Sequence, residues 1–119
     1  MIEKMEKDHL CNRAMEFILT QPVKELKDLT VADIARHLDV SHSYLSRKFK
    51  VERLFSLRDY LFREKMARSV SMLLEKTDLT IPEVAEKIGF FDADYFAYVF
   101  KHYFGISPGR YRTCKRVKN

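Results

Sequence analysis

The sequence predicts an all-α fold with seven helices, in which two similar subdomains are joined by a long helix. Glycine and proline are scarce, with three residues of each among 119, and this composition favours helices over strands and turns. One segment of the chain recurs about fifty residues later, and apolar residues around both copies follow helical spacing. The length suffices for one domain, or for two very small ones with modest cores.

The recurring segment is LTVADIARHLDVSHSYLSRKFK at residues 29–50, and it returns as LTIPEVAEKIGFFDADYFAYVFK at residues 79–101. Both copies open with a hydroxyl residue and an acidic residue three positions later, which can cap each other's backbone donors. These pairs are Thr30 with Asp33 and Thr80 with Glu83. Each copy is therefore expected to begin with a capped helix.

A sharp turn and a second capped helix follow in each copy. The first short helix runs into Asp39 or Gly89, residues that tolerate a left-handed backbone. Ser41 or Asp92 then supplies the cap of the next helix. A helix, a tight turn and a capped helix make a helix-turn-helix motif, so the chain is expected to carry two of them.

The predicted helices cover residues 6–20, 31–38, 42–53, 57–76, 81–88, 93–104 and 107–113. They divide the chain into an N-terminal helix-turn-helix subdomain (1–55), a linker helix (56–76) and a C-terminal helix-turn-helix subdomain (77–119). Aromatic residues are concentrated in the second copy, and we expect them to form its core: Phe90, Phe91, Tyr95, Phe96, Phe100, Tyr103 and Phe104.

The positive charge is concentrated in two segments. The net charge of the chain is +5, and residues 41–76 and 105–119 each sum to +5, whereas residues 1–40 and 77–104 are net negative. A basic protein of this kind suits a polyanion, because binding phosphates releases their counterions. Charge alone also fits basic proteins of other kinds, so its placement on the motifs carries the argument.

The chain resembles the AraC/XylS family of bacterial transcription regulators over residues 10–112. The stretches that carry the resemblance are SHSYLSRKFK, the helix from Tyr60 to Leu74, and PEVAEKIGF followed by YFAYVFKHYFGISPGRYR. The resemblance implies a seven-helix domain whose two helix-turn-helix units enter neighbouring major-groove segments of double-stranded DNA. It also implies regulation of transcription and contact with RNA polymerase. The two widely separated cysteines fit a reducing cytoplasm.

The linker helix has a length that fits this arrangement. A helix of about 20 residues is roughly 30 Å long, and successive major grooves on one face of DNA lie about 34 Å apart. We therefore expect one monomer to reach two half-sites.

In the first recognition helix, polar and basic residues share one face at helical spacing. The base-reading candidates are His42, Ser43, Ser46, Arg47 and Lys50. An arginine can form paired hydrogen bonds with guanine, and a serine can contact bases or phosphates. The alternative is a solvated helix face, which the position inside the repeat disfavours.

The matching face of the second helix consists of Asp94, Ala97, Tyr98 and Lys101. It departs from the family, which commonly has arginine at the position of Tyr98 and serine or threonine at that of Ala97. Asp92 and Asp94 add negative charge, which phosphate repels. We therefore expect strong base reading by the first unit and weak reading by the second. Tyr98 either packs on a thymine methyl group or is an ordinary aromatic residue at the rim.

Other basic residues are candidates for phosphate contacts, which position a protein on DNA without specifying sequence. They are Lys48, Arg53, Arg58, Arg63, Arg68, Arg110 and Arg112.

Other functions lack a sequence signal. The four histidines have no paired metal-ligand spacing, and Cys11 and Cys114 lie far apart, so no metal site and no disulfide framework are predicted. A nucleophile elbow and a glycine-rich phosphate loop are both missing, so neither an enzyme nor a cofactor is predicted. There is no apolar run long enough for a membrane span.

Two alternatives remain open. A protein-interaction module could use Phe91, Ala97 and Tyr98 as an apolar surface. The chain is either a stand-alone regulator or the C-terminal part of a longer one. In that second case a preceding domain would supply sensing and dimerisation, whereas the present chain is expected to be monomeric.

Overall fold

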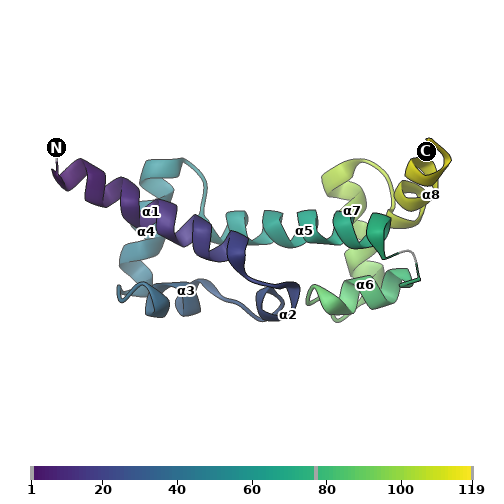
Figure 1. Cartoon of the computed structure of the whole chain (residues 1–119), viewed down its shortest axis with the longest axis horizontal. Coiled ribbons are helices and arrows are strands. Elements are labelled where there is room, and N and C mark those ends of the chain that lie inside the picture. Colours follow the sequence, from purple (N-terminus) through teal and green to yellow (C-terminus); the bar gives the residue numbers. More distant parts are fainter. Residues whose placement is uncertain (1, 77, 119) are drawn as a thin grey trace. The chain divides into compact units, whose positions relative to one another are not determined.

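The computed structural model describes residues 2–76 and 78–118, with the side chains of residues 9–76 and 78–115. This part of the chain is entirely helical (Figure 1), which confirms the all-α prediction. The helices are α1 (Ile2–Thr20), α2 (Val23–Leu26), α3 (Val31–His37), α4 (His42–Arg53), α5 (Leu57–Glu75), α6 (Ile81–Lys87), α7 (Ala93–Phe104) and α8 (Pro108–Lys118).

Three helices differ from the prediction. The described residues contain eight helices rather than seven, because a single turn, α2, follows Pro22, whose carbonyl accepts a hydrogen bond from the backbone N–H of Leu26 at 2.9 Å. A helix of four residues is too short to produce a periodic sequence pattern. Helix α1 begins earlier than expected and α8 continues beyond residue 113, since neither glycine nor proline interrupts those segments.

The chain forms two compact units, unit 1 (Met1–Glu64) and unit 2 (Lys65–Asn119), so the boundary lies within α5. The first part of α5 places Leu57 and Leu61 in the core of unit 1. Its second part contributes Met66 and Leu73, both fully buried, to unit 2. The joining helix is therefore divided between the units rather than standing apart from both.

In unit 1, α1 and α3 pack against α4 (Figure 1). The core consists of Cys11, Ala14, Ile18, Leu26, Ile34, Ala35, Leu38, Leu45, Phe49, Leu57 and Leu61. The ring of Phe49 lies edge-on to Phe55, with centroids 5.6 Å apart, and close to Tyr60. Most of the driving force for folding this unit comes from removing these side chains from water.

In unit 2, α7 packs between α6 and α8. Its buried apolar residues are Met66, Met72, Leu73, Val84, Ala85, Ile88, Phe96 and Phe100. Ser69 is also buried, and its hydroxyl group donates a hydrogen bond of 2.6 Å to the carbonyl of Met66, which satisfies the polar group inside the helix.

The prediction that all seven aromatic residues of the second copy form the core is wrong. Phe96 and Phe100 are fully buried, but Phe91 and Tyr95 are exposed, as are Tyr103 and Phe104. Only one stripe of a helix can face a core. In α7 the fully buried part of that stripe contains Phe96 and Phe100, four residues apart; Phe104 packs against Phe100, with ring centroids 4.6 Å apart, but lies at the exposed end of the helix.

The repeat extends further than its sequence identity suggests. Leu54 and Gly105, which end α4 and α7, both have a left-handed backbone, with φ of 67° and 87°. The N–H of Leu54 donates to the carbonyl of Lys50 at 2.9 Å, and that of Gly105 donates to Lys101 at 2.7 Å. The two recognition helices thus end in the same way.

The helices that follow also begin in the same way. The hydroxyl of Ser56 accepts a hydrogen bond from the N–H of Asp59, and that of Ser107 accepts one from Arg110. Four residues after each serine, a tyrosine packs near the last buried aromatic residue of the recognition helix; in unit 2, the Tyr111 and Phe100 centroids are 5.6 Å apart. Each repeat therefore includes a third helix start.

Gly105 and Gly109 provide a matched test of the left-handed ending. A methyl group added to either would meet no heavy atom within 4 Å, but only Gly105 has a positive φ. We expect Gly105→Ala to destabilise unit 2 by about 1 kcal/mol, because an L-residue is strained there. Gly109→Ala, inside α8, should stabilise the protein by about 0.5–1 kcal/mol. Chemical denaturation followed by circular dichroism would measure both, and equal effects would contradict the assignment.

Candidate nucleic-acid interface

Two capping boxes fix the helices that support the recognition helices. In α3, the hydroxyl of Thr30 accepts from the N–H of Asp33 at 3.1 Å, and the Asp33 carboxylate accepts from the N–H of Thr30 at 3.0 Å. Thr80 and Glu83 repeat this exchange in α6 at 3.2 and 2.8 Å. The hydrogen bond from the backbone of the threonine lowers the pKa of each acid, so both carboxylates stay ionised at neutral pH.

The turns between the helices are equivalent as well. Asp39 and Gly89 have positive φ angles of 60° and 101°, the left-handed conformation that the sequence predicted. After each turn a cap begins the recognition helix: Ser41 Oγ accepts from the N–H of Tyr44 at 3.1 Å, and Asp92 Oδ1 accepts from that of Asp94 at 2.8 Å. Both helix-turn-helix motifs are therefore formed as expected.

The candidate residues of α4 lie together on its outward side. Leu45 and Phe49 are fully buried and hold the helix in unit 1. The candidate residues lie on the other side of the helix and face outward. Ser46 is half-buried, and His42, Ser43, Arg47 and Lys50 are exposed. The resulting surface combines hydroxyl groups with two cations, which can donate hydrogen bonds to base edges and phosphates.

Two of the phosphate candidates on α4 are engaged within unit 1. Lys48 Nζ lies 3.4 Å from Glu52 Oε1 and 5.5 Å from the ring centre of Tyr44. Burial alone would lower the pKa of Lys48, but hydrogen bonding to these two residues raises it above its ordinary value. Arg53 donates to Asn12 Oδ1 on α1 at 2.6 Å. Both side chains therefore already have partners within unit 1.

Glu52, the acidic residue of α4, also accepts a hydrogen bond from Cys11 on α1. The thiol of Cys11 donates a 3.2 Å hydrogen bond to Glu52, and burial together with this carboxylate raises its pKa to about 11. Cys11 is therefore a neutral thiol at physiological pH.

Across residues 9–76 and 78–115, no group of three or more His, Cys, Asp or Glu side chains could hold a metal ion. No helix in the described residues is both long and apolar enough to span a membrane.

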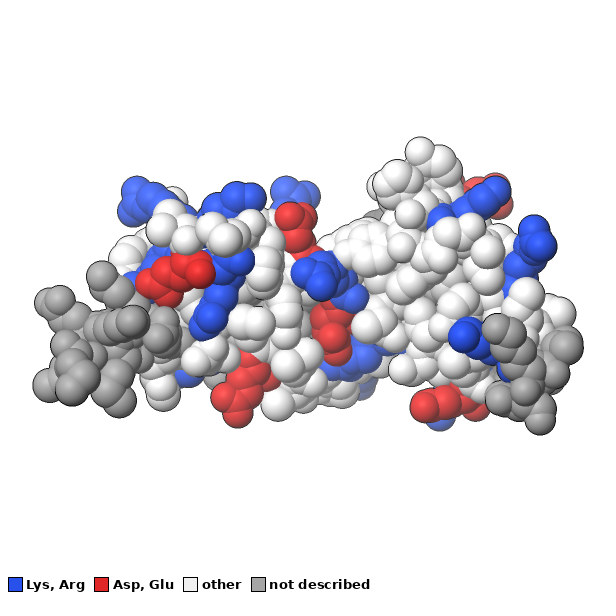
Figure 2. Space-filling model, turned by 90° about the horizontal axis from the view of Figure 1, so that it is seen from above, with Lys and Arg blue, Asp and Glu red and all other residues white. Residues whose placement is uncertain are grey.

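The corresponding face of α7 is different in chemistry. Asp94 and Lys101 are exposed and Ala97 is half-buried, while 70% of the Tyr98 side chain is exposed. Figure 2 shows Lys and Arg side chains gathered over unit 1, whereas those of unit 2 lie at the margins of an uncharged surface. The second recognition face thus offers rings and carboxylates where the first offers hydroxyls and cations.

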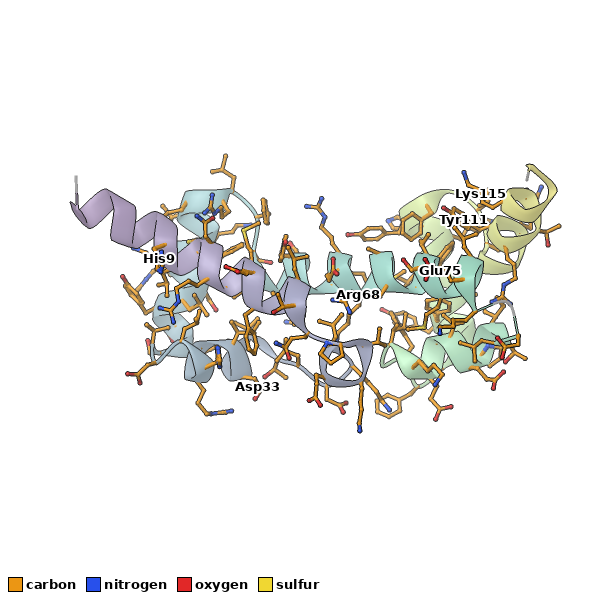
Figure 3. All side chains as sticks on the ribbon, in the orientation of Figure 1. His9, Asp33, Arg68, Glu75, Tyr111 and Lys115 are labelled. Carbon is orange, nitrogen blue, oxygen red and sulfur yellow. The ribbon has the colours of Figure 1, made fainter. Side chains whose placement is uncertain are left out.

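Three of the other phosphate candidates are exposed, namely Arg58, Arg63 and Arg110, and Arg68 on α5 is half-buried (Figure 3). Arg63 also lies 5.7 Å from the ring centre of Phe55. Lys115 on α8, which is not among the candidates from the sequence, is an exposed cation 5.7 Å from the ring centre of Tyr111 (Figure 3). The signal that could have found it is the spacing of four residues between the two.

Arg112, a phosphate candidate from the sequence, forms three hydrogen bonds to backbone carbonyls within unit 2. Its Nε donates to the carbonyl of Leu73 at 2.9 Å, and its Nη1 donates to that of Leu79 at 2.6 Å. Nη2 donates to the carbonyl of Lys76 at 3.3 Å. One guanidinium group therefore satisfies carbonyls at the end of α5 and in the loop before α6. We infer that Arg112 holds α8 against the end of α5 and the loop before α6.

Comparison with known proteins identifies the type of domain. A family model described as "Helix-turn-helix domain" matches residues 34–113. The Msm operon regulatory protein of Streptococcus mutans is 40% identical over 91 residues, which are 76% of this chain and 32% of that protein. The transcriptional regulatory protein HptR of Staphylococcus aureus is 34% identical over 108 residues, 87% of this chain and 41% of that protein. The chain thus spans well under half the length of these relatives.

Solved structures show the same arrangement of helices. The C-terminal domain of AraT, a response regulator from Geobacillus stearothermophilus, is 35% identical with a TM-score of 0.74, covering 88% of this chain and 84% of that one. The C-terminal domain of the two-component response regulator yesN from Fusobacterium nucleatum is 33% identical with a TM-score of 0.70, covering 83% and 93%. An AraC-type regulator from Chromobacterium violaceum, 21% identical with a TM-score of 0.77 over 92% and 94%, shares the fold.

Arg110 and Arg112 form a matched pair for testing the role of Arg112. We expect Arg112→Ala to lower the free energy of unfolding of unit 2 by about 2–3 kcal/mol, because charged hydrogen bonds to backbone carbonyls are lost. Arg110→Ala, at an exposed site, should change it by less than about 0.5 kcal/mol. Denaturant titration of both variants would measure this, and an Arg112→Ala protein as stable as the parent would refute the structural role.

Proposed function

Because the chain belongs to the AraC-type family of helix-turn-helix DNA-binding domains, we propose that it binds duplex DNA sequence-specifically through α4 and α7 and thereby regulates transcription. The observation that carries the proposal is the outward face of α4. Its polar and basic side chains lie together, and the single acidic residue of that helix, Glu52, pairs with Lys48 and Cys11. Such a face suits the negative potential and the acceptor-rich edges of a major groove.

Within α4, Arg47 is the residue with the chemistry for a specific contact. Its exposed guanidinium can donate two parallel hydrogen bonds to O6 and N7 of one guanine. Ser43 and Ser46 lie beside it and can donate to or accept from neighbouring bases. Lys50, one turn further along, would add a contact to a base or a phosphate.

The helix that joins the two units supports a model in which one chain occupies two grooves. Helix α5 is continuous over 19 residues, so it is about 29 Å long, close to the roughly 34 Å that separate successive major grooves. We therefore propose a monomeric binding unit in the bacterial cytoplasm. Regulation would follow from contact between the bound protein and RNA polymerase. If the chain is part of a longer protein, a preceding domain would add dimerisation.

A second function is favoured by the exposed rings of unit 2. Phe91, Tyr95 and Tyr98 are all exposed, and such a surface could instead dock another protein. Salt dependence separates the two functions, because DNA binding through several phosphates weakens steeply with salt and an apolar protein interface changes little.

The two-groove model predicts one protected pattern on DNA. Selection of bound sequences from random duplexes, followed by footprinting on the winning site, should show two major-groove segments about 10 base pairs apart on one face. Sedimentation of the complex should give one chain per site. A single short protected segment, or a complex that always contains two chains, would contradict the model.

The role of Arg47 predicts a loss of sequence discrimination. Arg47→Ala should weaken binding to the selected site by about 1–3 kcal/mol and relax the preference at one base pair. Arg47→Lys is the matched control, because it keeps the charge and the salt dependence but loses the two-pronged contact. Competition binding against duplexes with single base changes would measure both. An equal loss of affinity for every sequence would show that Arg47 contacts phosphate.

A further inference from the structure

Helix α7 occupies the place in unit 2 that α4 occupies in unit 1. Its buried residues, Phe96 and Phe100, are the counterparts of Leu45 and Phe49. Because the caps, turns and endings also match, the outward positions correspond one to one. Tyr98 therefore stands where α4 has Arg47, so this ring would lie at the base edges if α7 enters a major groove as α4 is proposed to do.

Two further exposed rings, Phe91 and Tyr95, lie near Tyr98 in the sequence, and Tyr95 also contacts Phe90 with ring centroids 5.9 Å apart. An apolar residue just before a helix cap usually packs against the fourth residue of the helix. Phe91 precedes the cap Asp92 but is fully exposed, and the ring that contacts Phe96 is that of Phe90, with centroids 5.3 Å apart. Tyr95, one turn before Tyr98, has 58% of its side chain exposed. Three rings thus border one end and one side of α7.

The hydrogen-bonding groups around Tyr98 are poorly suited to guanine. Guanine presents two acceptors in the major groove, which arginine or lysine can bind. Ala97 has no polar side-chain atom, Tyr98 has one hydroxyl, and Asp94 presents a carboxylate that repels acceptors. Lys101, one turn beyond Tyr98, is the single cation among the four outward positions of this face. The apolar group that the major groove does offer is the C5 methyl of thymine.

We infer that α7 recognises thymine methyl groups by ring contact, so that the half-site of unit 2 is rich in A·T pairs. This inference rests on the proposed function, since it requires unit 2 to lie in a major groove. Tyr98 is the central residue because it corresponds to Arg47. Tyr95 and Phe91 would extend the apolar contact toward the start of the helix.

The charge of unit 2 is mixed. Asp92 and Asp94 are exposed at the start of α7, next to the rings. The segment from residue 105 onward contains five basic residues and no acidic ones, and in α8, which packs against α7, both Arg110 and Lys115 are exposed. These cations suit the phosphates that flank a groove.

Replacing thymine by uracil tests the inference directly, because it removes the methyl group and keeps every hydrogen-bonding group of the base pair. The duplex is the one selected from random DNA, with dT changed to dU in the second segment only or, as the control, in the first segment only. Each methyl removed from the second segment should weaken binding by about three- to fivefold. The same change in the first segment should alter affinity less than twofold.

Variants of Tyr98 complete the test. Tyr98→Ala should weaken binding to the thymine duplex and remove the difference between the thymine and uracil duplexes, whereas Tyr98→Phe, which keeps the ring, should preserve that difference. The side chain is largely exposed, so both variants should fold, and circular dichroism would verify this.

The outcomes separate the inference from the function on which it rests. A second segment that is protected but contains no thymine, or that binds equally well with uracil, would overturn the inference and leave the proposed function intact. Protection of the first segment alone, with Tyr98→Ala binding DNA like the parent, would overturn it in favour of a protein partner. If the parent protein protected no DNA segment in a sequence-specific way, the proposed function itself would be overturned.

Discussion

The structure depends on the burial of two side chains, one helical turn apart, in each recognition helix. Leu45 and Phe49 hold α4, and Phe96 and Phe100 hold α7. Because only this stripe is buried, the outward residues of each helix can change without affecting the core. The same scaffold therefore presents serines and arginine in unit 1 and alanine and tyrosine in unit 2. Function in these units resides in the outward residues, and stability resides in the buried pair.

The sequence correctly predicted the caps and turns, whose hydrogen bonds join residues close to one another in the chain. The two capping boxes, the turns at Asp39 and Gly89 and the caps Ser41 and Asp92 all lie where spacing of residue types predicts them. Their partners are two to four residues apart, so the sequence itself contains the interaction. The outward face of α4 followed from the same periodicity, because burial of two residues determines the direction of the rest.

Long-range contacts escaped prediction. Arg112 looked like a phosphate ligand because its charge is visible in the sequence, but its carbonyl partners at residues 73, 76 and 79 are more than thirty positions away. The exposure of Phe91 was hidden for a similar reason. Which of two adjacent phenylalanines packs inward depends on the turn geometry, and Phe90 takes the inward place. Arg53 likewise has its partner, Asn12, 41 positions away on α1.

The shared beginnings of α5 and α8 change the definition of the repeating module. The repeating module consists of three helices, α3–α5 in the first copy and α6–α8 in the second, and in the first copy the third helix both closes its own core and continues into the next unit. Tandem duplication of such a module needs no new linker, because the closing helix already has its own cap, Ser56 or Ser107. Each residue added to that helix would lengthen it by about 1.5 Å and turn its end by about 100°. A change of one residue would therefore alter the direction of the helix end far more than its distance.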